Sequence, residues 1–159
     1  MTDPLPRVGI GFDSHPWAET RRPLWLGGVE FEGERGLAGH SDGDVVCHAI
    51  ADALLGAAAL GDIGRHFPEE DPTVAGITGT ALLVRTLEIV RRAGFTVRSC
   101  DATVICERPS IGPRSDAMRN QLGGSLRIPI ETVSLKATRP EGLGLAGDGV
   151  GCMAVAVLT

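Results

Sequence analysis

The sequence has no tyrosine, and among its 159 residues only two are tryptophan and four are phenylalanine. Proteins that bind single-stranded nucleic acid use aromatic side chains as stacking platforms. The chain also has no run of Lys or Arg, and its formal net charge is -5. A negative chain without a basic patch is not attracted to a phosphate backbone. We therefore expect no nucleic-acid partner.

Cysteine pairs of the C-x-x-C type are also missing, although the chain has Cys47, Cys100, Cys106 and Cys152. This excludes a zinc knuckle and a dithiol redox motif, and it favours buried free thiols in a reducing compartment. The start of the sequence, "MTDPLPRVGIGF", lacks a basic segment followed by an apolar one, and Asp52 interrupts the longest apolar-rich stretch. We therefore expect neither a secretory signal nor a membrane partner, and we predict a cytoplasmic protein.

What the sequence does have is an alternation of strand and helix patterns with no linker between them. The expected strands cover residues 7–12, 96–106, 132–138 and 149–159, and the expected helices cover residues 45–60, 78–95 and 115–122. Two short runs around Gly27-Gly28 predict a β-hairpin. Ser41, with Asp44 three residues later, resembles a capping box before the first helix. This organisation predicts one α/β domain spanning residues 1–159, large enough to bury its own core.

The stretch "GIGFDSHP" carries two candidate metal ligands, Asp13 and His15. Side chains two residues apart on a strand share a face, so these two would point the same way. On the first expected helix, Asp44, His48 and Asp52 recur every four residues and form one polar stripe. Asp13, His15 and His48 together would make a zinc site with an open fourth position, as catalytic zinc requires.

Two points about these candidate metal ligands and their neighbours stay open at the level of sequence. A turn at Asp13 and a solvated face of the helix would explain the same residues without a metal. If the metal is present, Asp44 and Asp52 are candidates to orient the ligating imidazoles, because such rings usually donate their second nitrogen to a carboxylate or carbonyl. His66 is interpreted as a surface residue of a polar loop.

Longer segments resemble a known family. "RVGIGFDSHPW", "HSDGDVVCHAIADALLGAAALGDIGRHFPEEDP", "DATVICERPSIGP" and "SLKATRPEGLGLAGDGVGCMAVAVL" are similar to the 2-C-methyl-D-erythritol 2,4-cyclodiphosphate synthases of the non-mevalonate isoprenoid pathway. The D-x-H element followed by H-S-D-G-D-x-x-x-H and L-G-D-I-G is the most specific part, and the resemblance runs from about residue 7 to the C-terminus. It implies an α/β fold with a small mixed β-sheet packed by helices and an N-terminal hairpin. It also implies a homotrimer whose active sites lie between neighbouring subunits.

The resemblance also implies a set of site residues. Asp13, His15 and His48 match the zinc ligands, and Glu141 matches the ligand of a second divalent cation, Mg2+ or Mn2+. The catalytic set adds the positions that contact the substrate's phosphates: His40, Ser41 and Thr138. The remaining substrate-binding positions are Asp62, Ile63 and Gly64 at the ribose, Cys106, Pro109, Ser110, Ile111 and Gly112 at the cytosine, and Arg139 and Pro140 beside Thr138. The cytosine pocket comes from the adjacent subunit.

The implied enzyme is a phosphorus–oxygen lyase. It would convert 4-diphosphocytidyl-2-C-methyl-D-erythritol 2-phosphate into the 2,4-cyclodiphosphate and CMP by intramolecular phosphoryl transfer. Ser110 stands where the family commonly has Lys, and Arg139 and Pro140 stand where it has threonines. We interpret Arg139 as still able to hold a phosphate, because guanidinium binds phosphate oxygens bidentately.

Two other classes of function are kept as alternatives. A zinc hydrolase of phosphate esters would share the Asp-His-His site but needs a base for water, for which only His40 or an Asp of "SDGD" could serve. A non-catalytic protein that binds cytidine nucleotides is suggested by Ser110 and by Asp148, where the family often has Arg.

Overall fold

The computed structural model describes residues 5–144 and 148–159, so Leu145, Ala146 and Gly147 of the glycine-rich loop lie outside the described residues. The strands are β1 (Arg7–Pro16), β2 (Trp25–Leu26), β3 (Val29–Glu30), β4 (Val97–Ile105), β5 (Val133–Thr138) and β6 (Gly149–Leu158). The helices are α1 (Val45–Ala57), α2 (Ile63–His66), α3 (Gly79–Arg92) and α4 (Ser115–Leu126), with short 3-10 turns at Gly112–Arg114 and Ile130–Thr132.

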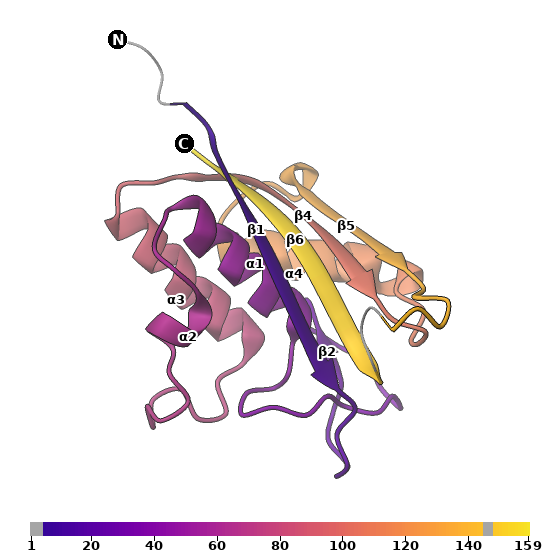
Figure 1. The fold of residues 1–159 in the computed structure, drawn as a ribbon. Helices are drawn as coiled ribbons and strands as arrows, with labels where there is room; N and C mark the ends of the chain where they lie inside the picture. Colours follow the sequence, from indigo (N-terminus) through magenta and orange to yellow (C-terminus); the bar gives the residue numbers. More distant parts are fainter. Residues whose placement is uncertain (1–4, 145–147) are drawn as a thin grey trace.

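A four-stranded mixed sheet forms the centre of the molecule, in the order β1-β6-β4-β5. β6 pairs antiparallel with both β1 and β4, whereas β4 and β5 are parallel. β2 and β3 form the separate hairpin that the sequence predicts around Gly27-Gly28. The mixed sheet and the hairpin agree with the fold that the resemblance implies. Figure 1 shows the start of β1 and the end of β6 near each other at one end of the sheet, far from the arrowheads of β1 and β4.

The sheet carries its helices on one face, where α1 packs against β1 and β6 and α3 packs on α1 (Figure 1). In the first half of β1, the residues that face the helices are glycines. A Cβ atom at Gly9 would lie 2.0 Å from the Ala53 carbonyl oxygen, and one at Gly11 would lie 1.9 Å from that of Ala49. Glycine is therefore required here, because it lets α1 approach the strand backbone directly.

The opposite face of the sheet is apolar and exposed. The side chains that alternate with the glycines of β1 point to this face, and Val8 and Ile10 each keep 66% of their surface exposed. Phe12 on β1 and Met153 and Val155 on β6 are exposed as well. Contiguous exposed apolar residues of this kind mark a surface that another molecule covers.

In the described part of the chain, no helix is long and apolar enough to cross a membrane.

The predicted elements are present, but several of their ends differ. β1 continues to Pro16 rather than ending at residue 12, α1 ends at Ala57 rather than at residue 60, and α4 extends to Leu126. The predicted capping box is wrong. Asp44 is itself the N-cap, and its carboxylate accepts from the amides of Val46 and Cys47, while the Ser41 hydroxyl accepts from Gly43. α2 was not predicted, because a helix of one turn has no periodicity to detect.

Candidate metal centre

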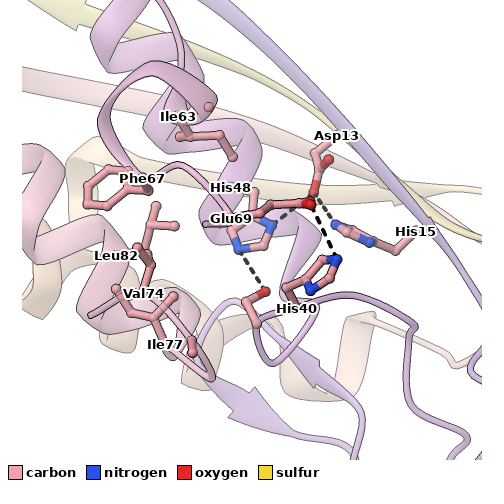
Figure 2. Close-up of a pocket in the computed structure, with 13 residues that line it drawn as sticks. Asp13, His15, His40, His48, Ile63, Phe67, Glu69, Val74, Ile77 and Leu82 are labelled. Carbon is pink, nitrogen blue, oxygen red and sulfur yellow. Dashed lines mark hydrogen bonds and ion pairs between the residues drawn. The ribbon is translucent and has the colours of Figure 1, made fainter. Parts of the chain in front are cut away.

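Two elements bring the three candidate metal ligands together. Asp13 and His15 lie on the inward face of β1, and His48 comes from the first turns of α1. Asp13 Oδ2 lies 3.1 Å from His15 Nε2 and 3.1 Å from His48 Nδ1. One ligand atom from each residue falls within 4.8 Å of the others (Figure 2). The close approach of α1 to the glycines of β1 makes this convergence possible, because His48 directly precedes Ala49.

The electrostatics of the three residues suit a divalent cation. Burial by itself would raise the pKa of the Asp13 carboxyl, but the hydrogen bonds and charges of His15 and His48 outweigh it and hold that pKa well below its usual range. For His48, burial would lower the pKa of the imidazole, and the Asp13 carboxylate raises it above 6.5. The Asp13 carboxyl therefore stays ionised, as a metal ligand must be. A carboxylate with two imidazoles is a donor set that zinc accepts.

The three candidate metal ligands form one wall of a cavity of about 300 Å³. His40, Ser41, Ile63 and Gly64, to which the resemblance assigns substrate binding, also line this cavity. His40 Nε2 lies 3.3 Å from Glu69 Oε2 at the cavity mouth, and both side chains are largely exposed. Figure 2 shows the polar residues gathered on one side of the cavity.

The other side of the cavity is apolar, and Ile63 is its only residue that the sequence analysis named. Its lining residues are Ile63, Phe67, Val74, Ala75, Ile77 and Leu82. Leu82 has the helical spacing of a core residue, and Phe67 and Val74 lie in an irregular loop. No sequence signal separates such residues from ordinary core, since apolar residues in a loop or on a buried helix face pack in either case.

The two acids that flank His48 do not contact an imidazole. Asp44 is completely buried, and its carboxylate accepts from the backbone amides of Gly27 and Gly28 at 2.8 and 2.7 Å, which fastens the hairpin to the start of α1. Asp52 accepts from the amide of Ile63 at 2.7 Å and so holds the start of α2. The hypothesis that Asp44 and Asp52 orient the metal-ligating rings through hydrogen bonds is therefore wrong. Each fixes a neighbouring segment instead.

The remaining predicted site residues lie outside this cavity, at Asp62 and in two segments that follow β4 and β5. Asp62 caps α2, where its carboxylate accepts from the amide of Arg65 at 2.9 Å. The segment from Cys106 to Gly112 follows β4, and the segment from Thr138 to Glu141 ends and follows β5. Because β4 and β5 are parallel, the two segments leave the sheet at the same edge, and the Cys106 amide donates to the Thr138 carbonyl at 3.2 Å. None of the described residues in these two segments lines the metal cavity.

Fold and site together define a single-domain α/β protein that presents a carboxylate and two imidazoles as a candidate metal site beside a cavity. The chain belongs to the YgbB family, whose sequence profile matches residues 6–159. It is similar to 2-C-methyl-D-erythritol 2,4-cyclodiphosphate synthase from Syntrophobacter fumaroxidans, with 50% identity over 154 residues that cover 96% of both chains. The resemblance seen in the sequence is confirmed.

Two further relatives extend this comparison. The bifunctional enzyme IspD/IspF of an Anaeromyxobacter species is 51% identical over 150 residues, which cover 94% of this chain and 38% of that protein. The solved structure of a 2C-methyl-D-erythritol-2,4-cyclodiphosphate synthase in a CDP-bound form has a TM-score of 0.88 at 35% identity, and the match covers 96% of this chain and 100% of that one. The mixed α/β fold is therefore shared with synthases of this kind.

Proposed function

We propose that this chain converts 4-diphosphocytidyl-2-C-methyl-D-erythritol 2-phosphate into 2-C-methyl-D-erythritol 2,4-cyclodiphosphate and CMP, the activity for which its relatives are named. The observation that carries the proposal is the convergence of Asp13, His15 and His48 at a cavity in a chain of this family. The enzyme is a phosphorus–oxygen lyase of isoprenoid biosynthesis. One domain over residues 1–159 carries the activity, in the cytoplasm, where its four free buried cysteines suit a reducing compartment.

The reaction forms one phosphorus–oxygen bond and breaks another. An oxygen of the 2-phosphate attacks the β-phosphorus of the diphosphate, and the bond from that phosphorus to the oxygen of the departing CMP breaks. Both phosphates belong to one substrate molecule, so the protein needs no nucleophile of its own. Its task is to hold two mutually repelling phosphates in line for the attack. Correct orientation of this kind lowers the activation free energy by up to about 7–11 kcal/mol.

Asp13, His15 and His48 would hold Zn2+, which supplies positive charge to polarise a phosphate oxygen when bound. His40 and Ser41, at the cavity beside the ligands, would bind and orient the phosphates. The apolar wall formed by Phe67, Val74 and Leu82 keeps water from competing with the 2-phosphate as the attacking group. A hydrolase would need a positioned base for water, but the Asp42 and Asp44 carboxylates already accept backbone amides, and the relatives are named as cyclodiphosphate synthases. The cyclase is therefore favoured over the hydrolase.

The nucleotide end of the site is proposed to come from an adjacent subunit. In that subunit the segment from Cys106 to Gly112, with Pro109, Ser110 and Ile111, would hold the cytosine, and Asp62, Ile63 and Gly64 of the first subunit would hold the ribose. Thr138 and Arg139 would contact phosphate, and Glu141 would bind Mg2+ or Mn2+ together with phosphate oxygens. Arg139 and Glu141 are exposed, as such contacts across a subunit boundary require.

The exposed apolar face of β1 and β6 supports a homotrimer, which would cover Val8, Ile10 and Phe12. We expect the parent protein to be trimeric in light scattering and Ile10→Glu to be monomeric, because the substitution places a charge in each interface. The monomer should also lose activity, since half of each site would be absent. Ala117→Glu, on the exposed side of α4, is the matched control and should stay trimeric. A trimeric Ile10→Glu variant would exclude this face as the interface.

The activity is tested by incubating the purified protein with the diphosphocytidyl substrate, Zn2+ and Mg2+, and following the products by phosphorus NMR. We expect a cyclic diphosphate together with an equal amount of CMP. A linear phosphate product would identify a hydrolase instead. If the substrate stays unchanged in a protein that separate measurements show to bind zinc and CDP, the protein is the non-catalytic nucleotide-binding alternative.

A further inference from the structure

Arg22 reaches the wall of the metal cavity from outside it. Residues 39–43, here called the 39–43 loop, contain His40 and Ser41 and lead into α1. The half-buried guanidinium of Arg22 donates from Nη1 to the Gly39 carbonyl at 3.0 Å and from Nη2 to the Ser41 carbonyl. The carbonyl between them, that of His40, accepts from the amide of Gly76 at 3.1 Å. One planar side chain thus holds the loop on both sides of His40.

The 39–43 loop in turn lies against both imidazoles of the metal centre. His15 Nε2 faces Asp13, and the Cε1–Nδ1 bond of the ring lies beside Gly39, where an added Cβ atom would be 3.2 Å from both atoms. His48 Nδ1 faces Asp13, and His48 Nε2 lies 3.4 Å from the Ser41 hydroxyl. The loop therefore packs against the His15 ring and offers a hydrogen-bond partner to the second nitrogen of His48.

We propose that Arg22 is a positioning residue for the metal centre: its guanidinium fixes the 39–43 loop, and the loop holds His15 and His48 in the orientation that binds zinc. The partner of the second ring nitrogen sets the orientation and tautomer of a ligating imidazole. Ser41 is that partner for His48, and its own position depends on the carbonyl that Arg22 holds. Arg22 itself does not line the cavity. The inference rests on the zinc site proposed above.

Arginine rather than lysine is needed for this role. Two carbonyl oxygens separated by one residue match the two terminal nitrogens of a guanidinium, whereas an ammonium is a single point donor at the end of a flexible chain. Arg22→Lys keeps the positive charge and most of the packing. It therefore tests specifically whether two donor nitrogens on one planar group are needed. Arg21→Ala is the control for a change in this segment, because it removes a full charge from the neighbouring, exposed residue, which is a larger electrostatic change than Arg22→Lys makes.

The test measures zinc affinity by competition with a chelator in the parent, Arg22→Lys and Arg21→Ala, with thermal melting to confirm equal folding. We expect Arg22→Lys to bind zinc about tenfold more weakly, at the lower end of the roughly 10–100-fold losses seen when the partner of a ligand is removed. Arg21→Ala should match the parent. The visible spectrum of the Co2+-substituted protein should change in Arg22→Lys alone, because it reports ligand geometry and not stability.

A second comparison tests the route through Ser41. In a Ser41→Ala background, Arg22→Lys should weaken zinc binding by clearly less than tenfold, since residues that act through one contact are not additive. Equal zinc affinity and equal cobalt spectra in the parent and Arg22→Lys would overturn the role of Arg22 and leave the zinc site standing. A parent protein that binds no zinc would overturn both proposals.

Discussion

A His48→Ala variant should bind no zinc at equimolar metal and turn over the diphosphocytidyl substrate about 10³-fold more slowly, while remaining folded. Zinc stabilises charge in a phosphoryl-transfer reaction by several kcal/mol, and about 4 kcal/mol corresponds to this factor. Asp13 and His15 alone are too few ligands for a stable site. Zinc content by atomic absorption, turnover by phosphorus NMR and circular dichroism together measure the three expectations.

His48→Ala should keep its fold because the core does not depend on the metal. Among the residues that the structure describes, His48 is one of three buried polar or charged ones, and the core around it is a large apolar cluster that α1 shares with the sheet and α3. We expect a loss of about 1–3 kcal/mol of stability, typical of a buried substitution. His66→Ala is the control: His66 Nε2 bonds to the Leu60 carbonyl, outside the metal cluster, so this variant should keep one zinc. Global unfolding of His48→Ala would mean that the zinc is structural.

Gly11→Ala should destabilise the protein strongly, although it adds only one methyl group. Its Cβ would lie 1.9 Å from the Ala49 carbonyl oxygen and 2.7 Å from the Ala53 amide nitrogen, and both are backbone atoms of α1 that cannot turn aside. Helix and strand must therefore separate. Overpacking of this kind costs more than about 3 kcal/mol. Zinc binding should be lost as well, because β1 carries Asp13 and His15 while α1 carries His48.

Gly124→Ala is the matched control for Gly11→Ala. It adds the same methyl group within α4, where a Cβ would have no neighbour within 4 Å, and the residue is exposed. Replacing a helical glycine by alanine should stabilise the protein by about 0.5–1 kcal/mol. Urea denaturation of both variants measures the difference. A Gly11→Ala protein as stable as the parent and still able to bind zinc would contradict the close contact between β1 and α1.

The local order of elements was predictable because each depends on short-range signals. Alternation, helical spacing and the paired glycines of the hairpin predicted the main strands and helices within a few residues. Which face of β1 the helices cover was not predictable. Val8, Ile10 and Phe12 carry the apolar signal, but they point away from the helices, and the glycines between them face α1. Periodicity reports that two faces differ, and not which of them the helices cover.

In the candidate site, too, some features were predictable from the sequence and others were not. The grouping of the three candidate metal ligands was predictable because a D-x-H pair on a strand and a histidine on a helix are recognisable from residue type and spacing. The roles of Asp44 and Asp52 were not, because i, i+4 spacing places them beside His48 without deciding which hydrogen bonds they make. Both accept backbone amides from other segments. The apolar wall of the cavity and Arg22 carry no local signal.

The sequence by itself determined which residues can bind a metal, which segments become strands and helices, and the family to which the chain belongs. These depend on residue chemistry and on spacing along the chain, both of which a sequence contains. Only the tertiary structure decided that α1 rests directly on the glycines of β1, that an apolar cavity opens beside the ligands, and that Arg22 braces the loop behind both imidazoles. These depend on contacts between residues distant in sequence, which exist only after the chain has folded.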